Sequence, residues 1–278
     1  MAEGTSAASP DFAQPAVVVD KHADGSYLLS SPYALEPYPD HLIVALQRWA
    51  REAPDRAFFA ERLDRNAVPR AGNGWRKLTY AQAAAGAAAI AQALLARGHT
   101  PSRPIAILCD NSIDHALVMF GAMYAGIPVM PVSPAYSLMS HDFAKLKAVF
   151  AFADPSLVYV GDARPFKKAL AALDRSRFGI LVSGDDAGLN AERLSDWLAT
   201  KPGPEAAEAL AKVGPDTNAK ILLTSGSTGM PKGVINTHRM MCSNQVALAQ
   251  LWRFVRKRPP VLVPARARAR QPDRRLRR

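Results

Sequence analysis

The feature that most constrains the fold is an alternation of short apolar segments and helical segments over residues 104–182. Four apolar runs have the length of buried strands, namely residues 104–109, 127–132, 157–160 and 178–182. The segments between them are long enough for helices. Strands that alternate with helices in this way predict a parallel sheet with helical crossovers. The expected fold class is therefore α/β, with a mostly parallel sheet flanked by helices.

The intervening segments have helical periodicity and recognisable ends. Helices are predicted over residues 113–125, 140–153 and 163–173, and Asn111 or Ser112 would cap the first of them. Each helix would carry the chain from one strand of the sheet to the next.

Two further helices are expected upstream. The first is predicted over residues 41–53, with Asp40 as its N-cap, because its apolar side chains share one face. The second begins after Thr79, where Thr79 and Gln82 have the spacing of a capping box. It is expected to stop at Gly98, since glycine is favoured just after the end of a helix.

The N-terminal residues 1–31 are rich in Ala, Ser and Pro at first and have no sustained hydrophobic period, so a loose arm is expected. Residues 1–12 have no basic start followed by an apolar run, which predicts no secretory signal. Residues 116–140 contain no charged side chain, and this length would permit a membrane span. Because Gly126 and Pro128 interrupt the segment, a buried helix, a turn at Gly126 and a buried strand are favoured instead.

The net charge of +11 is a local feature of the chain. Residues 253–278 contain eleven Lys or Arg and one acidic residue, so the remainder carries 24 basic and 23 acidic side chains. A balanced body gives no general argument for nucleic-acid partners. The two cysteines, Cys109 and Cys242, form no CxxC pair, which disfavours a disulfide framework and a cysteine zinc site. They suit a reducing compartment, and a cytoplasmic protein is predicted.

The segment most informative about chemistry runs from Ile221 to His238. An apolar strand leads into a loop of glycines and hydroxyl side chains, and a lysine and a second apolar pair follow. Glycines allow successive backbone N–H groups to turn toward one anion. Hydroxyls add donors for phosphate oxygens, and a lysine adds positive charge. The candidate phosphate-binding residues are Thr224, Ser225, Gly226, Ser227, Thr228, Gly229 and Lys232.

This loop differs from the Walker P-loop, G-x-x-x-x-G-K-[ST], which a helix must follow immediately. Met230 and Pro231 come directly before Lys232. Gly233 stands where Ser or Thr would be expected, and the residues after it have the pattern of a strand. We therefore expect a loop between two strands, without a helix dipole. A Ser/Gly-rich linker is the alternative, but linkers seldom lie between two apolar segments.

The phosphate-binding signature of the AMP-forming adenylating enzymes resembles the segment Thr224-Ser-Gly-Ser-Thr-Gly-Met-Pro-Lys-Gly-Val234. This superfamily includes acyl-CoA synthetases, luciferases and the adenylation domains of peptide synthetases. Two upstream segments resemble the family in the expected order, Leu78-Thr79-Tyr80 and residues 122–132. The resemblance covers about residues 32–263. Residues 133–138 and 236–244 look most similar to the corresponding segments of feruloyl-CoA synthetase-like ligases within the family.

The resemblance implies a two-step reaction. A carboxylate attacks the α-phosphate of ATP and releases pyrophosphate, and the thiolate of coenzyme A then displaces AMP. It implies ATP with Mg²⁺, coenzyme A as co-substrate, and a small carboxylic acid, for which we expect an aromatic or hydroxycinnamic acid. The seven loop residues would hold the β- and γ-phosphates in a binding rather than a catalytic role, and His238 would line the substrate cleft. No His, Asp or Glu cluster has metal-ligand spacing, so any Mg²⁺ is expected to be bound mainly by ATP.

The resemblance also implies that this chain is part of a longer enzyme. The family's later motifs, including a ribose-binding aspartate and a C-terminal catalytic lysine, have no counterpart here. We therefore expect residues 32–263 to form a partial N-terminal adenylating domain that has no ligase turnover by itself.

The Arg-rich tail, residues 264–278, has the composition that GC-rich coding DNA gives when it is read out of frame. A frameshift near codon 264 is our preferred interpretation. One alternative is a non-catalytic nucleotide-binding protein whose basic tail binds phosphate backbones, and another is a disordered tail without a function. The tail lacks interleaved aromatic residues, which disfavours nucleic acid as a partner. A small-molecule kinase is a weaker reading, disfavoured by the Pro-Lys-Gly ending of the loop.

Overall fold

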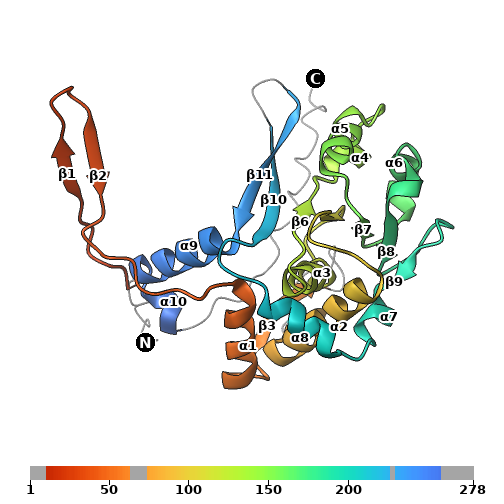
Figure 1. Ribbon diagram of the computed structural model, residues 1–278, viewed down its shortest axis with the longest axis horizontal. Helices are drawn as coiled ribbons and strands as arrows, with labels where there is room; N and C mark the ends of the chain where they lie inside the picture. The colour runs from red at the N-terminus through yellow and green to blue at the C-terminus, as the bar shows by residue number, and fades with distance from the viewer. Residues whose placement is uncertain (1–10, 63–73, 226–228, 258–278) are drawn as a thin grey trace, which may run out of the picture.

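The computed structural model describes residues 11–62, 74–225 and 229–257, and Figure 1 shows their arrangement. A seven-stranded sheet lies at the centre. Its strands are, from edge to edge, β11 (Pro231–Thr237), β10 (Asn218–Ser225), β6 (Val129–Pro131), β5 (Ile105–Ile107), β7 (Leu157–Val160), β8 (Gly179–Val182) and β9 (Glu192–Arg193). Every neighbouring pair is parallel except β10 with β11. The predicted α/β fold with a mostly parallel sheet is therefore confirmed.

Helices pack on both faces of this sheet (Figure 1). One apolar cluster joins the first face to α1 (Leu42–Glu52), α2 (Tyr80–Ala96), α3 (Ile113–Tyr124), α7 (Leu194–Leu198) and α8 (Pro204–Ala211). A second cluster joins the opposite face to α5 (Ala144–Ala153) and α6 (Lys167–Ala171), with α4 (Ala135–Leu138) nearby. The remaining helices are α9 (His238–Leu251) and α10 (Phe254–Lys257). Short 3₁₀ turns cover Arg164–Phe166 and Arg175–Arg177.

Alternation along the strands divides the side chains between the two clusters. Ile105 and Ile107 of β5 pack with the first cluster, whereas Ala106 and Leu108 pack with the second. Successive side chains of a strand point to opposite faces of a sheet. Because both faces are covered at the middle of the sheet, β5 and β7 are apolar and buried throughout, as strands of parallel sheets generally are.

The second predicted helix has the capping box that its sequence indicates. The Thr79 N–H donates to Gln82 Oε1 at 2.9 Å, and the Gln82 N–H donates to Thr79 Oγ1 at 3.2 Å. Gly98 follows the helix with a φ of +75°, a conformation that glycine adopts without steric cost. For α3, the structure decides between the two candidate caps, since Ser112 accepts the N–H of His115 at 3.0 Å.

Two predicted helix starts were wrong. The first helix is preceded by His41 rather than Asp40 as N-cap, without a side-chain capping hydrogen bond. The helix expected from residue 140 begins at Ala144 instead. Ser140 Oγ accepts the Phe143 N–H, and Asp142 Oδ1 accepts the Ala144 N–H. These side chains offer the backbone an alternative to helical hydrogen bonds.

The helix expected over residues 163–173 is split. A 3₁₀ turn precedes α6, which ends at Ala171. Short antiparallel pairs that the sequence did not indicate also occur. One joins β3 (Ala57–Arg62) to β4 (Trp75–Thr79), and the other joins β1 (Val18–Lys21) to β2 (Tyr27–Ser30).

The β1–β2 hairpin lies within the segment predicted as a loose arm. All eight of its residues are exposed, and the hairpin stands apart from the sheet at one side of Figure 1. Residues 1–10 and the Arg-rich tail, residues 264–278, lie outside the described residues. No helix in the described part of the chain is both long and apolar enough to cross a membrane.

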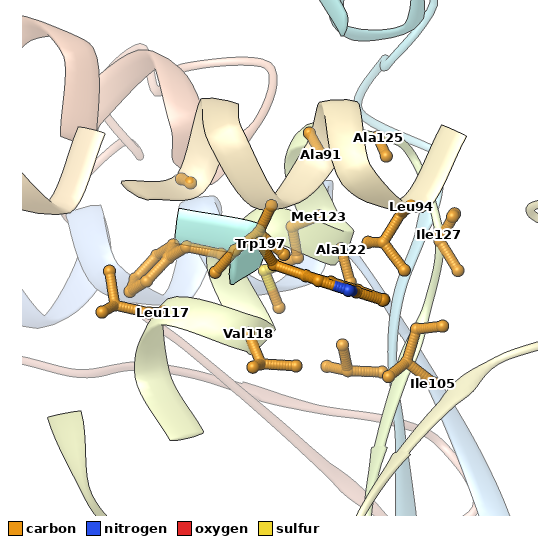
Figure 2. Close-up of a cluster of buried hydrophobic side chains, with 14 of the residues drawn as sticks. Ala91, Leu94, Ile105, Leu117, Val118, Ala122, Met123, Ala125, Ile127 and Trp197 are labelled. Carbon is orange, nitrogen blue, oxygen red and sulfur yellow. The ribbon is translucent and has the colours of Figure 1, made fainter. Parts of the chain in front are cut away.

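The centre of the first cluster is Trp197, which is fully buried. Its side chain is surrounded by residues of α2, α3 and the neighbouring strands (Figure 2). The indole Nε1–H donates to Glu192 Oε2 at 2.8 Å, so the only polar atom of the ring is satisfied. This cluster fixes α2 and α3 against the sheet and thereby fixes the strand ends that carry the candidate site.

Candidate phosphate-binding site

The glycine- and hydroxyl-rich loop connects β10 and β11, which form an antiparallel hairpin. In its register, Thr224 lies opposite Lys232 and Ser225 lies opposite Pro231. Gly229 has a φ of +79°, which suits glycine. The loop was predicted to lie between two strands rather than before a helix, and this is confirmed, because β10 precedes it and β11 follows it. Gly226, Ser227 and Thr228 lie outside the described residues.

Thr224 and Lys232 are the two loop residues whose side chains the structure describes. Directly opposed residues of an antiparallel pair point to the same face, and both side chains are exposed. The Thr224 hydroxyl lies 3.5 Å from the Lys232 carbonyl oxygen. No ion pair of Lys232 occurs among the described residues. A hydroxyl and an ammonium group that face one solvent-accessible region can bind a phosphate oxygen together.

The opposite face of the hairpin holds it against the body of the protein. Ile221 and Leu223 pack on the second apolar cluster, and Gly233 approaches Phe152 so closely that an added Cβ would lie 3.3 Å from the ring. The face of the hairpin that carries Thr224 and Lys232 stays open, since the side chains of Leu222 and Val234 on that face are 41% and 47% exposed. Because β10 runs parallel to β6, the loop lies at the carboxyl edge of the sheet, where open α/β sheets bind their ligands.

His238 is placed away from this loop. It is the first residue of α9, six positions beyond Lys232 along β11, or about 20 Å at the rise of an extended strand. Its side chain is fully buried, and its Nδ1 accepts the Leu42 N–H at 3.4 Å. The structure therefore places His238 in the packing between α1 and α9, not on the open face that carries Thr224 and Lys232.

A second histidine packs against His238. The rings of His41 and His238 lie 5.9 Å apart between centroids, edge to face. His41 Nδ1 and His238 Nε2 are both buried without a hydrogen-bond partner among the described residues. Burial, with a smaller contribution from the neighbouring His41, lowers the pKa of His238 from 6.5 to about 4. Burial also lowers the pKa of His41, and the charge of Asp40 opposes that shift.

Acidification is expected to destabilise this packing. The pKa of His238 is lower in the folded chain than in the unfolded chain, so the unfolded state binds more protons below pH 6.5. Stability is therefore complete above pH 6.5, and about 3 kcal/mol of it should be lost as the pH falls toward 4.

The measurement is urea unfolding at pH 7.5, 6.0 and 5.0, comparing wild type with His238→Gln. The glutamine variant cannot protonate, so its stability should fall less steeply over this range. Equal slopes for the two proteins would contradict the assignment to His238.

No group of three or more His, Cys, Asp or Glu suited to a metal ion occurs in the part of the chain that the structure describes. The open face of the hairpin instead presents Thr224 and Lys232, a donor set that suits an anion.

One residue on that open face escaped the sequence analysis. Lys220 is a charged residue within the apolar strand β10, and it is half-buried. The sequence did contain a signal for this residue, namely a charged side chain inside an apolar run, because lysine is rarely buried unless a partner balances its charge.

The chain is similar in sequence to peptide synthetases and to ligases of long-chain fatty acids. The chain is 29% identical over 164 residues to phosphinothricin tripeptide synthetase PhsC of Streptomyces viridochromogenes, covering 59% of this chain and 13% of that protein. It is 29% identical over 170 residues to the long-chain-fatty-acid–CoA ligase FadD13 of Mycobacterium tuberculosis, covering 60% and 31%. It is 29% identical over 224 residues to the long-chain-fatty-acid–AMP ligase FadD32 of Mycolicibacterium smegmatis, covering 77% and 32%. The matched part is thus less than one third of each relative.

Solved structures share this fold. The fatty acid AMP ligase of Legionella pneumophila superposes with a TM-score of 0.56 at 20% identity, covering 75% of this chain and 32% of that one. VinN superposes with a TM-score of 0.56 at 19% identity, covering 77% and 50%.

The sequence family described as AMP-binding enzyme matches residues 46–265. This range holds the central sheet, the β10–β11 hairpin and the helices on both faces of the sheet, except for the first residues of α1. With the loop chemistry, the fold and the family in agreement, the chain belongs to the AMP-binding enzyme family.

Proposed function

We propose that this chain supplies the nucleotide-binding part of an ATP-dependent, AMP-forming acid–CoA ligase. The observation that carries the proposal is the exposed Thr224–Lys232 pair at the end of the β10–β11 hairpin. The pair lies within the segment that the AMP-binding family matches, at the edge of the sheet where α/β folds bind ligands.

The loop residues would act by binding and charge neutralisation. Backbone N–H groups and hydroxyls would hold the β- and γ-phosphates of ATP, and Lys232 would offset their charge. The proposed set is Thr224, Ser225, Gly226, Ser227, Thr228, Gly229 and Lys232. ATP would bring Mg²⁺, which usually binds through substrate phosphates in such sites. The carboxylate would then attack the α-phosphate with pyrophosphate as leaving group, and coenzyme A would accept the acyl group from AMP.

The substrate is proposed to be a small carboxylic acid. The relatives named above include ligases of long-chain fatty acids, which supports an acid ligase. An aromatic or hydroxycinnamic acid, as in feruloyl-CoA synthetase-like ligases, is our more specific proposal. It rests on the resemblance of residues 133–138 and 236–244. Binding of ferulate, benzoate and a long-chain fatty acid, measured side by side, tests it.

Removal of the Lys232 ammonium group should weaken ATP binding at least tenfold. A charge-assisted contact to phosphate contributes about 1.5–3 kcal/mol, and about 1.4 kcal/mol corresponds to a tenfold change in Kd. The measurement is isothermal titration calorimetry of ATP with Lys232→Ala. The matched control is Lys212→Ala, because Lys212 is exposed at the end of α8, and α8 lies at the opposite side of the molecule from the free end of the β10–β11 hairpin (Figure 1). An unchanged Kd for Lys232→Ala would remove the basis of the proposal.

The chain alone is expected to bind nucleotide without completing turnover, since its match spans less than one third of FadD13 and of FadD32. Acid-dependent exchange of pyrophosphate into ATP should stay at the background rate. Exchange above background by the purified chain would show that these residues suffice for adenylation.

A further inference from the structure

The register of the sheet places Lys220 on the same open face as the phosphate loop. Lys220 pairs with Val129 of β6, and Val129 pairs with Ile105 of β5. Four residues further along each strand are Thr224 on β10 and Cys109 after β5. Residues separated by an even number of positions point to the same face of a strand. Lys220 and Thr224 therefore share one face of β10, and Cys109 packs on the same side, against the first apolar cluster. Lys220 is level with the first residues of β5 and β6, and Thr224 lies four positions nearer the carboxyl edge of the sheet.

The hairpin register extends this face to β11. Lys220 lies opposite Asn236, Leu222 opposite Val234 and Thr224 opposite Lys232, so all six point to the same side. The two lysines thus stand at opposite ends of one open surface. They are separated by about 13 Å along the strand direction, at roughly 3.3 Å per residue.

The ammonium group of Lys220 has no balancing charge in the part of the chain that the structure describes. No ion pair of Lys220 occurs within the described ranges of the chain, although the residue is half-buried. Burial lowers its pKa. A partly desolvated ammonium without a counter-ion is costly, and an anion placed beside it would recover that cost. Lys232, by contrast, is exposed to solvent.

The side chains of His115 and Cys109 lie near Lys220. His115, in the first turn of α3, has its Nδ1 3.9 Å from Cys109 Sγ. Burial is the largest cause of a lowered pKa for His115, and the positive charge of Lys220 lowers it further. Lys220 and His115 therefore lie close enough to interact electrostatically, and Cys109 is in contact with His115.

We propose that Lys220, flanked by His115, is a second anion-binding residue of the ligand site, at the end of the open face away from Lys232. It would receive an oxyanion of the ligands, either a phosphate of the nucleotide or a carboxylate of the acid. This inference rests on the proposed function, since it assumes that Lys232 and the loop hold one part of the same ligand set.

The affinity test uses Lys220→Met, which removes the charge and keeps the apolar stem. Lys220→Arg restores a positive charge, and Lys212→Met is the exposed control. Calorimetric titrations are made with ATP, pyrophosphate, benzoate and succinate. Lys220→Met is expected to bind at least fivefold more weakly the probe whose oxyanion Lys220 receives, and the arginine variant should recover part of the loss. Loss for ATP or pyrophosphate assigns a phosphate, and loss for benzoate or succinate assigns a carboxylate.

Alkylation of Cys109 by iodoacetamide reports the place of binding, because the thiol touches His115. Cys242 is 2% exposed, and burial raises its pKa to about 11, so it is a slow internal control. The bound probe should slow alkylation of Cys109 at least threefold in wild type and in Lys212→Met. At the same probe concentration the protection should be weaker in Lys220→Met, and modification of Cys242 should not change in any variant. Peptide mapping by mass spectrometry separates the two sites.

The outcomes separate this inference from the proposed function. If Lys220→Met binds every probe like wild type and Cys109 keeps its protection, the inference is overturned. A loss of ATP binding in Lys232→Ala would leave the proposed function standing in that case. If the wild-type chain binds none of the probes, both are overturned. Equal thermal melting curves for the Lys220 variants and wild type establish that an altered affinity does not arise from unfolding.

Discussion

Replacing Trp197 with alanine is expected to lower the free energy of unfolding by about 3–5 kcal/mol. The indole is fully buried among side chains of α2, α3 and the sheet (Figure 2). The change removes the largest fully buried side chain of the described residues and leaves a cavity that rigid neighbours cannot close. It also leaves Glu192 Oε2 without the hydrogen bond from Nε1, although Arg97 remains bonded to that oxygen at 2.6 Å.

Urea unfolding followed by far-UV circular dichroism measures this loss, since the readout does not depend on the removed fluorophore. Trp252→Ala is the control, because Trp252 is 45% exposed, and it should cost at most about 1 kcal/mol. Trp197→Phe should fall between the two, as it keeps most of the apolar volume and loses the hydrogen bond. A loss below about 1 kcal/mol for Trp197→Ala would mean that this cluster does not hold the helices to the sheet.

A single methyl group at Gly121 is expected to destabilise the fold by about 3 kcal/mol, at the upper end for overpacked cores. Gly121 lies on α3 where it crosses α2, and an added Cβ would stand 2.4 Å from Cγ2 and 2.5 Å from Cβ of Ile90. Because Cβ is attached directly to the backbone, a rotamer change of Ile90 cannot relieve the overlap. The two helices must move apart, which loosens the packing that they share with the sheet.

Thermal and urea unfolding of Gly121→Ala provide the test, with Gly214→Ala as the matched control. An added Cβ at Gly214 meets nothing within 4 Å, so the control should change stability by less than about 0.5 kcal/mol. Gly86→Ala should be intermediate, since its new Cβ would meet mainly the end of the Leu117 side chain at 2.9 Å, which can move. If Gly121→Ala is as stable as Gly214→Ala, the close approach of α2 and α3 is not a constraint on this fold.

Local features were readable from the sequence alone. The capping box of Thr79 and Gln82, the strand over 157–160 and the loop between two strands were all predicted from residue type and spacing. Each depends on hydrogen bonds or periodicity within a few residues, so neighbouring residues determine it. The α/β class followed because alternating strands and helices leave few ways to bury both sheet faces.

The arrangement of the candidate site was decided by the tertiary structure. His238 belongs to the α1–α9 packing because Leu42, far away in the sequence, donates to its ring. Lys220 joins Thr224 and Lys232 on one open face because β10 pairs with β6 on one side and with β11 on the other. Residue type and spacing determined which short segments form and which loop suits a phosphate. Strand order and register determined which side chains meet there, because contacts between distant segments depend on how the whole chain packs.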